Sequence, residues 1–272
     1  MPANDPRSRR DIAPEALRDI AAELAVGAGE LIRDGRRTAS RVTTSKSSPT
    51  DVVGEMDHAS EAFLSAELAR LRPDDGLLGE EGSSRTGTTG LCWIVDPIDG
   101  TVNYLYGIPA YAVSVAAEVD GVVIAGAVCN PETGELFSAW LGGGAWLGPH
   151  RLSGSRPDSL SIALVSTGFS YDAVRRGEQA LVAAALLPRV RDLRRIGSAA
   201  LDLCQVAAGR LDAHYEQDLH RWDFAAGALI AAEAGAVVTG AGGRPADERL
   251  VIAAAPTIAG ALCALLDQLL ST

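Results

Sequence analysis

The sequence predicts a mixed fold, with an α+β first half and an α/β second half. Residues 111–146 contain successive short apolar runs separated by glycine-containing turns, which is typical of an antiparallel meander. After residue 160, apolar runs alternate with amphipathic or alanine-rich segments, which is the pattern of an α/β unit. A polar stretch over residues 148–159 separates the two patterns. We therefore expect one half over residues 1–150 and another over residues 151–272.

The first half is expected to begin with two helices. Pro14 opens the first helix, in which apolar residues recur at helical spacing until Asp34-Gly35 ends it. A turn-rich segment follows, and a second amphipathic pattern then covers about residues 56–71 and is closed by Pro73. Both helices are expected to pack on the antiparallel sheet that the meander forms.

Two short strands are expected between these helices and the meander. They cover residues 76–79 and 91–95, and each is followed directly by carboxylates. Because proline cannot donate a ladder hydrogen bond, we expect Pro97 to stop the second strand. The segment 99–101 then predicts a turn into a short helix.

In the second half, strands and helices are expected to alternate. The expected strands lie in residues 160–168, 193–196, 211–215 and 249–254. The expected helices cover residues 178–187, 198–209 and 224–234, and a last helix opens at Pro256.

Composition excludes some classes of function. The net charge of the 272 residues is -11, whereas duplex binding needs clustered cations, so we expect no nucleic-acid partner. The apolar run over residues 250–266 is short for a bilayer and is interrupted by Pro256 and Gly260, so we expect no membrane span. No apolar run follows the N-terminal charges, so we expect no signal peptide. The four cysteines lie far apart without a C-x-x-C pair, which indicates reduced thiols. These patterns indicate a cytoplasmic protein.

Asp96 and Asp99 place two like charges close together at the end of a buried strand. Capping of the next helix explains Asp99 on its own. Asp96 is harder to explain, because burying an unpaired carboxylate costs on the order of several kcal/mol. No lysine or arginine lies within ten residues of it. A hard divalent cation such as Mg²⁺, which takes carboxylate, carbonyl and water oxygens, would supply the missing charge.

Other acidic residues could reach the same place, although each has a simpler explanation. Glu80 and Glu81, taken alone, are typical of a solvated turn. Asp223 stands at the start of an apolar helix, where an N-cap explains it as well as a functional role does. Asp57 could likewise be an acid in the first turn of a helix.

Four spaced motifs together resemble the inositol monophosphatase family of Mg²⁺-dependent, lithium-sensitive phosphatases. They are WIVDPIDGTVN at residues 93–103, WDFAAG at 222–227, GEE at 79–81 and KSSPTD at 46–51, in the family's order over nearly the whole chain. The resemblance implies a layered αβαβα sandwich of the type shared with fructose bisphosphatase. It also implies a homodimer.

The resemblance further implies a cluster of two or three Mg²⁺ ions. Matched residue by residue, the first ion would be bound by Glu80, Asp96 and the carbonyl of Ile98, the second by Asp96, Asp99 and Asp223, and a weaker third by Asp57 with Glu80. Cations shared by Asp96 would reverse the local repulsion from Asp99. Most ligands would then come from the first half of the chain.

By the same resemblance, the reaction is hydrolysis of a phosphate monoester by metal-activated water. Glu80, Thr101 and Asp99 would be catalytic, with Glu80 and Thr101 orienting the water and Glu81 in support. Substrate would contact Ile98, Asp99, Gly100, Thr101, Arg194, Gly197, Ser198, Ala199, Glu216 and Asp223. A surface or interface pair explains Arg194-Arg195 about as well.

The expected substrate is myo-inositol 1-phosphate or a similar polyol phosphate. Histidinol phosphate, fructose 1,6-bisphosphate and 3′-phosphoadenosine nucleotides are served by relatives with similar motifs, and these motifs do not separate them. A regulatory binding protein that does not depend on turnover is the alternative from another class. It is disfavoured because such a chain would have no chemical reason to keep every carboxylate. Many members carry threonine and histidine where Val102 and Tyr106 stand here, so the rim chemistry can differ.

Overall fold

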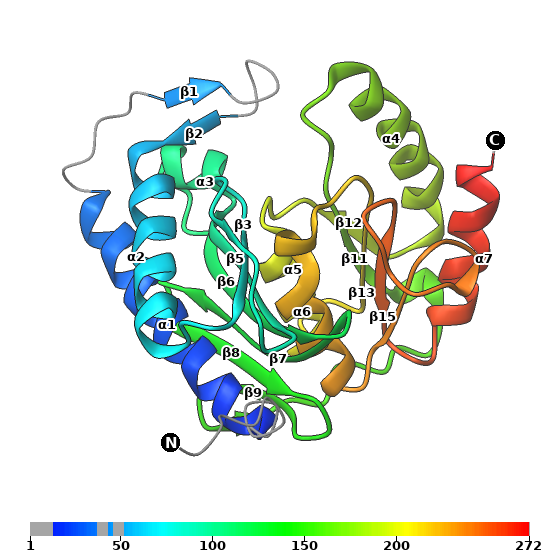
Figure 1. Cartoon of the computed structure of the whole chain (residues 1–272). Helices are drawn as coiled ribbons and strands as arrows, with labels where there is room; N and C mark the ends of the chain where they lie inside the picture. The colour runs from blue at the N-terminus through cyan, green and yellow to red at the C-terminus, as the bar shows by residue number, and fades with distance from the viewer. Residues whose placement is uncertain (1–12, 37–42, 46–51, 272) are drawn as a thin grey trace.

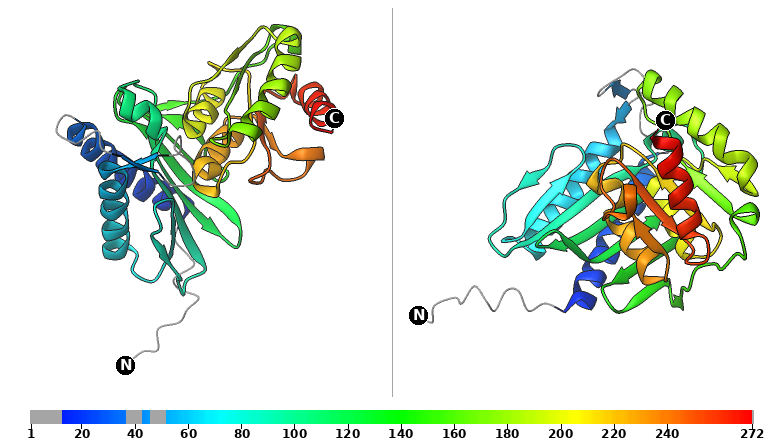
Figure 2. Two further views of the ribbon diagram at one scale, coloured as in Figure 1. Left: turned by 90° about the horizontal axis from the view of Figure 1, so that it is seen from above. Right: turned by 90° about the vertical axis from the view of Figure 1, so that its right-hand side faces the viewer.

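A computed structural model describes residues 13–36, 43–45 and 52–271 of the chain. Two sheets alternate with three layers of helices (Figure 1). The helices are α1 (Pro14–Gly35) and α2 (Glu55–Leu71) in the first layer, α5 (Ala199–Ala207) and α6 (Arg221–Glu233) in the middle, and α4 (Ala173–Leu186) and α7 (Ala259–Leu270) in the last. Seen from above in Figure 2, α4 and α7 lie on the side away from α1 and α2. The predicted layered sandwich is confirmed.

The larger sheet has eight strands in the order β10-β9-β8-β7-β6-β5-β3-β4. Its strands are β3 (Gly76–Gly79), β4 (Ser84–Arg85), β5 (Leu91–Asp99), β6 (Ala112–Val119), β7 (Val122–Asn130), β8 (Glu135–Trp140), β9 (Gly144–Leu147) and β10 (His150–Arg151). Neighbouring strands are antiparallel except for β3 and β5. The predicted meander is therefore confirmed.

The second sheet has five strands in the order β12-β11-β13-β15-β14. Its strands are β11 (Leu164–Thr167), β12 (Asp192–Arg194), β13 (Ala213–Glu216), β14 (Val237–Thr239) and β15 (Val251–Ala254). β11 is parallel to β12 and β13, whereas β15 is antiparallel to both its neighbours. β14 was not predicted, because its three residues carry too little pattern to be distinguished from a loop.

The remaining elements are short. They are the hairpin β1 (Thr43–Ser45) and β2 (Val52–Gly54), the helix α3 (Thr101–Tyr106), and the 3-10 turns η2 (Leu160–Ile162), η3 (Leu187–Arg189) and η4 (Ala241–Gly243). None of the helices within the described ranges has the length and apolarity to cross a bilayer. The KSSPTD motif at residues 46–51 lies outside the described residues.

Four apolar clusters fill the four interfaces between the layers. β5 contributes to two of them, because successive side chains of a strand point to opposite faces. Trp93 and Val95 pack against α1 and α2, whereas Ile94 packs on the other face with residues of α5 and α6. A central strand covered on both faces is therefore apolar at every position, as this one is up to Val95.

The expectation that Pro97 stops β5 is wrong. The strand continues to Asp99, and its pairing with β6 changes register on the way, with Asp96 opposite Ser114 and Asp99 opposite Ala112. Three steps along β5 thus match two steps along β6, which is a β-bulge with one extra residue. Proline is tolerated there because a bulge leaves a ladder position unpaired.

Two helices begin earlier than their apolar patterns indicated. α4 starts at Ala173 because the Asp172 carboxylate accepts a hydrogen bond of 2.8 Å from the Arg175 amide and caps the helix. α6 starts at Arg221, ahead of the predicted Phe224. α5 and α6 belong to the second half of the chain but pack against both sheets. The two halves therefore share a helical layer, and their division at residue 150 stays a prediction.

The contact between β7 and α6 depends on small residues. A Cβ added at Gly126 of β7 would lie 3.0 Å from Ala226 Cβ and 3.1 Å from Ala226 Cα, so the helix backbone lies almost directly on the strand. Ala226 is fully buried in the apolar cluster between the large sheet and the helices α5 and α6, and Gly126 is also buried. This close approach fixes how far α6 stands from the sheet.

We expect Gly126→Val to destabilise the protein by about 1–3 kcal/mol, because the added methyl groups overpack this contact. The matched control is Gly177→Ala in α4, where an added Cβ meets open space. That change should stabilise the protein by up to about 1 kcal/mol, because alanine favours the helix. Urea unfolding of both variants measures the difference, and equal effects would contradict the packing argument.

Candidate active site

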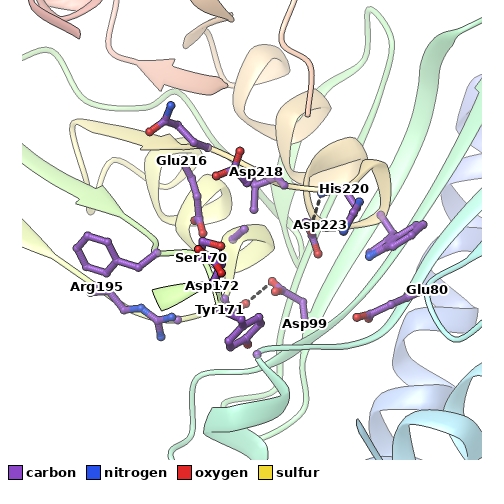
Figure 3. A pocket seen from close by; sticks show the side chains of 18 residues that line it. Glu80, Asp99, Ser170, Tyr171, Asp172, Arg195, Glu216, Asp218, His220 and Asp223 are labelled. Atoms are coloured by element: carbon purple, nitrogen blue, oxygen red, sulfur yellow. Dashed lines mark hydrogen bonds between the residues drawn. The ribbon is translucent and has the colours of Figure 1, made fainter. Parts of the chain in front are cut away.

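Three carboxylates converge where β5 and α6 meet. Oxygens of Asp96, Asp99 and Asp223 all lie within 4.8 Å of one another. Asp96 and Asp99 come from the bulged end of β5, and Asp223 comes from the first turn of α6. Figure 3 shows Asp99 and Asp223 facing the same space as Glu80. The sequence-predicted ligands of the second ion are therefore together.

The β-bulge explains how residues three apart can share one face. In a regular strand, Asp96 and Asp99 would point to opposite sides of the sheet. The extra residue resets the alternation, and Ile98 consequently packs in the same cluster as Trp93 and Val95, against α1 and α2. Asp99 then faces α5. The Ile98 amide donates a hydrogen bond of 3.0 Å to Asp96 Oδ1, which fixes that carboxylate inside the bulge.

Asp99 is held by the start of α5. Its Oδ2 accepts hydrogen bonds of 2.5 Å from Ser198 Oγ and 2.7 Å from the Ala200 amide. Burial raises the pKa of Asp99 to about 6, and these two hydrogen bonds limit the rise because they favour the charged form. Ser198 also caps α5 by accepting from the Leu201 amide at 3.3 Å. Ser198 and Asp99 therefore join the two halves of the chain.

Asp96 has the least favourable surroundings for a negative charge. Burial raises its pKa well above the usual range, and the charges of Glu80, Asp99 and Asp223 raise it further. Such a group either takes up a proton or pairs with a cation. The donors gathered here are all carboxylate oxygens, which suit a hard divalent cation rather than a soft one. The residues thus fit the metal that the sequence predicted.

Asp57 and Thr101 form a hydrogen-bonded pair beside this group. Asp57 lies in the first turn of α2, where its Oδ2 accepts from the Gly54 amide at 2.9 Å. Thr101 Oγ1 lies 3.1 Å from Asp57 Oδ1 and 3.0 Å from the Ile98 carbonyl oxygen, and its single proton can be donated to one of them at a time. Burial raises the pKa of Asp57 to about 6.

The turn that carries Glu80 and Glu81 is held by a residue that the sequence did not single out. Glu61 of α2 is buried, and its carboxylate accepts hydrogen bonds of 2.6 Å from the Glu81 amide and 2.7 Å from the Ser83 amide. A Cβ at Gly79 would lie 2.6 Å from Glu61 Oε2, so the family's GEE motif needs its glycine. Glu61 stands four residues after Asp57 on one helix face, and this spacing was the available signal.

Asp223 combines a structural and a site position. It is the third residue of α6, and its Oδ2 accepts a hydrogen bond of 2.6 Å from the His220 amide. Asp223 therefore helps to cap α6, although the N-cap residue itself is His220. The same geometry brings its carboxylate to Asp96 and Asp99.

A cavity of about 340 Å³ opens beside the carboxylates. It is lined by several sequence-predicted residues: Glu80, Asp99, Gly100, Gly197, Ser198, Ala199, Glu216 and Asp223. It is also lined by residues that the sequence did not assign to the site, mainly Phe169, Ser170, Tyr171, Asp172, Arg195, Gln217, Asp218 and Trp222 (Figure 3). Most of these come from the loop after β11 and the segment between β13 and the start of α6, whereas Arg195 follows β12. Apart from the WD pair, these segments carry no recognisable motif of their own.

Arg194 does not line this cavity. Its guanidinium Nη1 lies 2.6 Å from Asp192 Oδ2, and its side chain is about half exposed. Arg195 lines the cavity instead. The predicted contact of Arg194 with the substrate stays a prediction. The two arginines differ in position because the last residue of a strand and the residue after it point in different directions.

Gly100 and Asn103 fix the segment between β5 and α3. Gly100 has φ 92°, and an added Cβ would lie 3.0 Å from the carbonyl oxygens of Ala110 and Gly197, so only glycine fits. The Asn103 amide donates to Ala110 O at 2.7 Å and to Ile196 O at 2.8 Å. Asn103 ends the WIVDPIDGTVN motif, and its contacts hold the loop before α5 against the end of β5.

Known proteins match the chain over almost its whole length. Residues 13–271 match the model of the "Inositol monophosphatase family". "Inositol-1-monophosphatase" of Mycobacterium leprae (strain TN) is 49% identical, with 98% of this chain and 96% of that protein covered. The solved structure of "Mycobacterium tuberculosis SuhB" superposes with a TM-score of 0.83 at 46% identity, and covers 95% of this chain and 98% of that chain.

A further relative carries a different name. "Nus factor SuhB" of Escherichia coli (strain K12) is 37% identical, with 81% of this chain and 84% of that protein covered. Names within the set of relatives therefore differ. The chain belongs to the inositol monophosphatase family.

Proposed function

We propose that this protein is a metal-dependent phosphomonoesterase that hydrolyses myo-inositol 1-phosphate or a closely related polyol phosphate. One observation carries the proposal: Asp96, Asp99 and Asp223 converge beside a cavity with a largely polar lining, in a chain of this family. The relative with 49% identity is named for this activity. By the family resemblance alone, we also propose a cytoplasmic homodimer.

Mg²⁺ is the proposed metal, with two or three ions per chain. Glu80, Asp96 and the Ile98 carbonyl would hold the first, Asp96, Asp99 and Asp223 the second, and Asp57 with Glu80 a third. The mutual approach of the second set and its all-oxygen chemistry support this assignment. When bound, Mg²⁺ supplies positive charge to the phosphoryl oxygens and lowers the pKa of a water molecule.

The chain's own residues would orient that water and accept its proton. Thr101 Oγ1 stands between Asp57 and the Ile98 carbonyl. When its proton is donated to Asp57 Oδ1, its lone pairs are available to a water molecule on the cavity side. Glu80, which lines the cavity, would accept the proton of the water directly, or Thr101 would accept it while passing its own hydroxyl proton on to Asp57.

The alcohol portion of the substrate would lie between the start of α5 and the end of β13. Gly197, Ser198 and Ala199 line one side of the cavity and Glu216 the other. A carboxylate accepts hydrogen bonds from hydroxyl groups, so this lining favours a polyol over an apolar alcohol. Fructose 1,6-bisphosphate, histidinol phosphate and 3′-phosphoadenosine nucleotides remain the competing substrates.

Phosphate release from these four substrates tests the proposal directly. We expect the highest kcat/KM for myo-inositol 1-phosphate, no release in EDTA, and inhibition by tens of millimolar lithium, about the range of common screening salts. Potassium chloride at the same ionic strength is the control for screening. If folded protein with Mg²⁺ hydrolyses none of the four, the enzyme proposal is wrong.

Asp96→Asn should lower kcat/KM by about three orders of magnitude or more, because it removes a charge shared by two ions. The fold should survive, since asparagine keeps the oxygen that accepts from the Ile98 amide. Glu67→Gln, an acid-to-amide change at a side chain that is 32% exposed, is the matched control and should be neutral. Near-normal turnover of Asp96→Asn would refute the shared-metal assignment.

The Asp96→Asn variant also distinguishes a second candidate function from the phosphatase activity. A regulatory binding role that does not depend on turnover is favoured by the Escherichia coli relative named "Nus factor SuhB". If that role holds here, cells carrying only Asp96→Asn protein should grow normally although they release no phosphate from the substrate. A growth defect that a phosphatase of unrelated sequence restores would exclude it.

Stability should depend on pH when no metal is bound. Folding raises the pKa of Asp57 and Asp99 from 3.8 to about 6, so the folded state binds their protons more tightly than the unfolded state. This contribution is fully present below about pH 4 and is lost as the pH rises through about 6. In calorimetry, Mg²⁺ should therefore raise Tm more at about pH 7.5 than at about pH 5. An equal gain at both values would contradict the cation assignment.

A further inference from the structure

Glu216 needs a neighbour that fixes its carboxylate. It lies at the end of β13, lines the cavity, and has a side chain that is only 14% exposed (Figure 3). Burial raises its pKa well above the usual range, and the charges of Asp202, Asp223 and Asp99 raise it further, whereas Arg195 lowers it. A carboxylate in such surroundings recognises hydroxyls only if a donor holds it in place.

His214 stands two residues earlier on the same strand and therefore on the same face. Its ring is fully buried, and burial lowers its pKa to about 3, so the ring is neutral at physiological pH. Nδ1 lies 3.0 Å from Ser166 Oγ, the residue directly opposite on β11. Nε2 lies 3.6 Å from Glu216 Oε2 and has no hydrogen-bond partner among the described residues.

The two tautomers of this ring have opposite effects on Glu216. If Nδ1 carries the proton, it donates to Ser166 and the lone pair of Nε2 faces the carboxylate, which is repulsive. If Nε2 carries the proton, Ser166 donates to Nδ1 and the N–H is directed at Glu216 Oε2. When Glu216 is ionised, the second tautomer is favoured, and its N–H in turn stabilises the negative charge against the burial that raises the pKa of Glu216. The 3.6 Å separation exceeds a hydrogen bond by about half an ångström, which a small rotation of the carboxylate closes.

Asp202 is the competing acceptor for the Ser166 hydroxyl. It is buried on α5, and burial raises its pKa to about 8 while its interaction with Ser166 lowers it. The raised pKa favours the protonated form of Asp202, which competes less strongly than a carboxylate for the hydroxyl proton of Ser166, and the hydroxyl lies 3.0 Å from His214 Nδ1. Ser166 is thereby left as a donor to Nδ1.

Gly168 limits the position of Glu216 from the other side. A Cβ added at Gly168 would lie 1.7 Å from Glu216 Oε1 and 2.0 Å from its carboxyl carbon. The carboxylate therefore occupies the space where a side chain of residue 168 would begin. Both oxygens thus lie close to the backbone of the loop after β11, and Oε2 also faces His214.

We propose that His214 is a positioning residue for substrate recognition, whose Nε2–H orients the Glu216 carboxylate toward the hydroxyl groups of the alcohol. The inference rests on the proposed phosphatase function and deepens it. His214 is not among the residues that line the cavity and acts only through Glu216, so its effect should be confined to substrates whose alcohol carries hydroxyl groups.

The test compares myo-inositol 1-phosphate with phenyl phosphate, whose alcohol has no further hydroxyl. His214→Leu should lower kcat/KM for myo-inositol 1-phosphate about tenfold, mainly through KM, and change that for phenyl phosphate by no more than about twofold. His214→Gln keeps an N–H donor and should recover most of the loss. Added to Glu216→Gln, His214→Leu should cause no further loss, because both remove the same contact.

Two further variants keep the test decisive if His214→Leu does not fold. Ser166→Ala removes the donor to Nδ1, and Gly168→Ala displaces Glu216, so both should lower activity selectively on myo-inositol 1-phosphate. Equal losses on both substrates in folded variants, additive losses in the double variant, or no change at all would overturn the inference. Wild-type protein that fails on myo-inositol 1-phosphate would instead overturn the proposed function, and the His214 inference with it.

Discussion

The repulsion among the carboxylates gathered around the end of β5 is the constraint on which the rest of the site depends. Three of these side chains, Asp57, Asp99 and Asp223, are each held through one oxygen by a backbone amide at the start of a helix. The positive end of a helix favours such a charge, although it offsets only part of the cost of burial. The helices come from both faces of the large sheet, so the site exists only when the layers are assembled.

The spacing of these layers is set well away from the carboxylates. Gly126 and Ala226 let α6 lie directly on β7, and Gly227 does the same between α6 and Leu203 of α5. Larger side chains there would move the first turns of both helices away from β5. The alanine and glycine content of the middle layer, which contributes little to a hydrophobic pattern, therefore has a direct bearing on where Asp223 lies.

Local patterns were sufficient to predict most of the fold. The meander is visible because each of its turns is short, and α1 because its apolar face and Pro14 agree. The bulge at Pro97 was mispredicted because its register depends on β6, which no local pattern of β5 contains. Arg194 and Arg195 are chemically identical neighbours, so only the direction of the backbone decides which of them lines the cavity. Glu61 was overlooked because the amides that it holds, those of Glu81 and Ser83, are distant in the sequence, and His214 because its contact with Ser166 spans 48 residues.

The bulge also makes chain length, and not only side-chain identity, a determinant of the chemistry. Inserting one residue between Asp96 and Asp99, with the bulge still absorbing a single extra residue, would keep every acidic residue in the chain. Three regular steps of the strand would then separate the two aspartates, so one of the two carboxylates would turn to the opposite side of the sheet, toward α1 and α2. A relative can therefore retain all the acids of this site and still be unable to bring them together, and the number of residues in this segment is the feature that distinguishes the two cases.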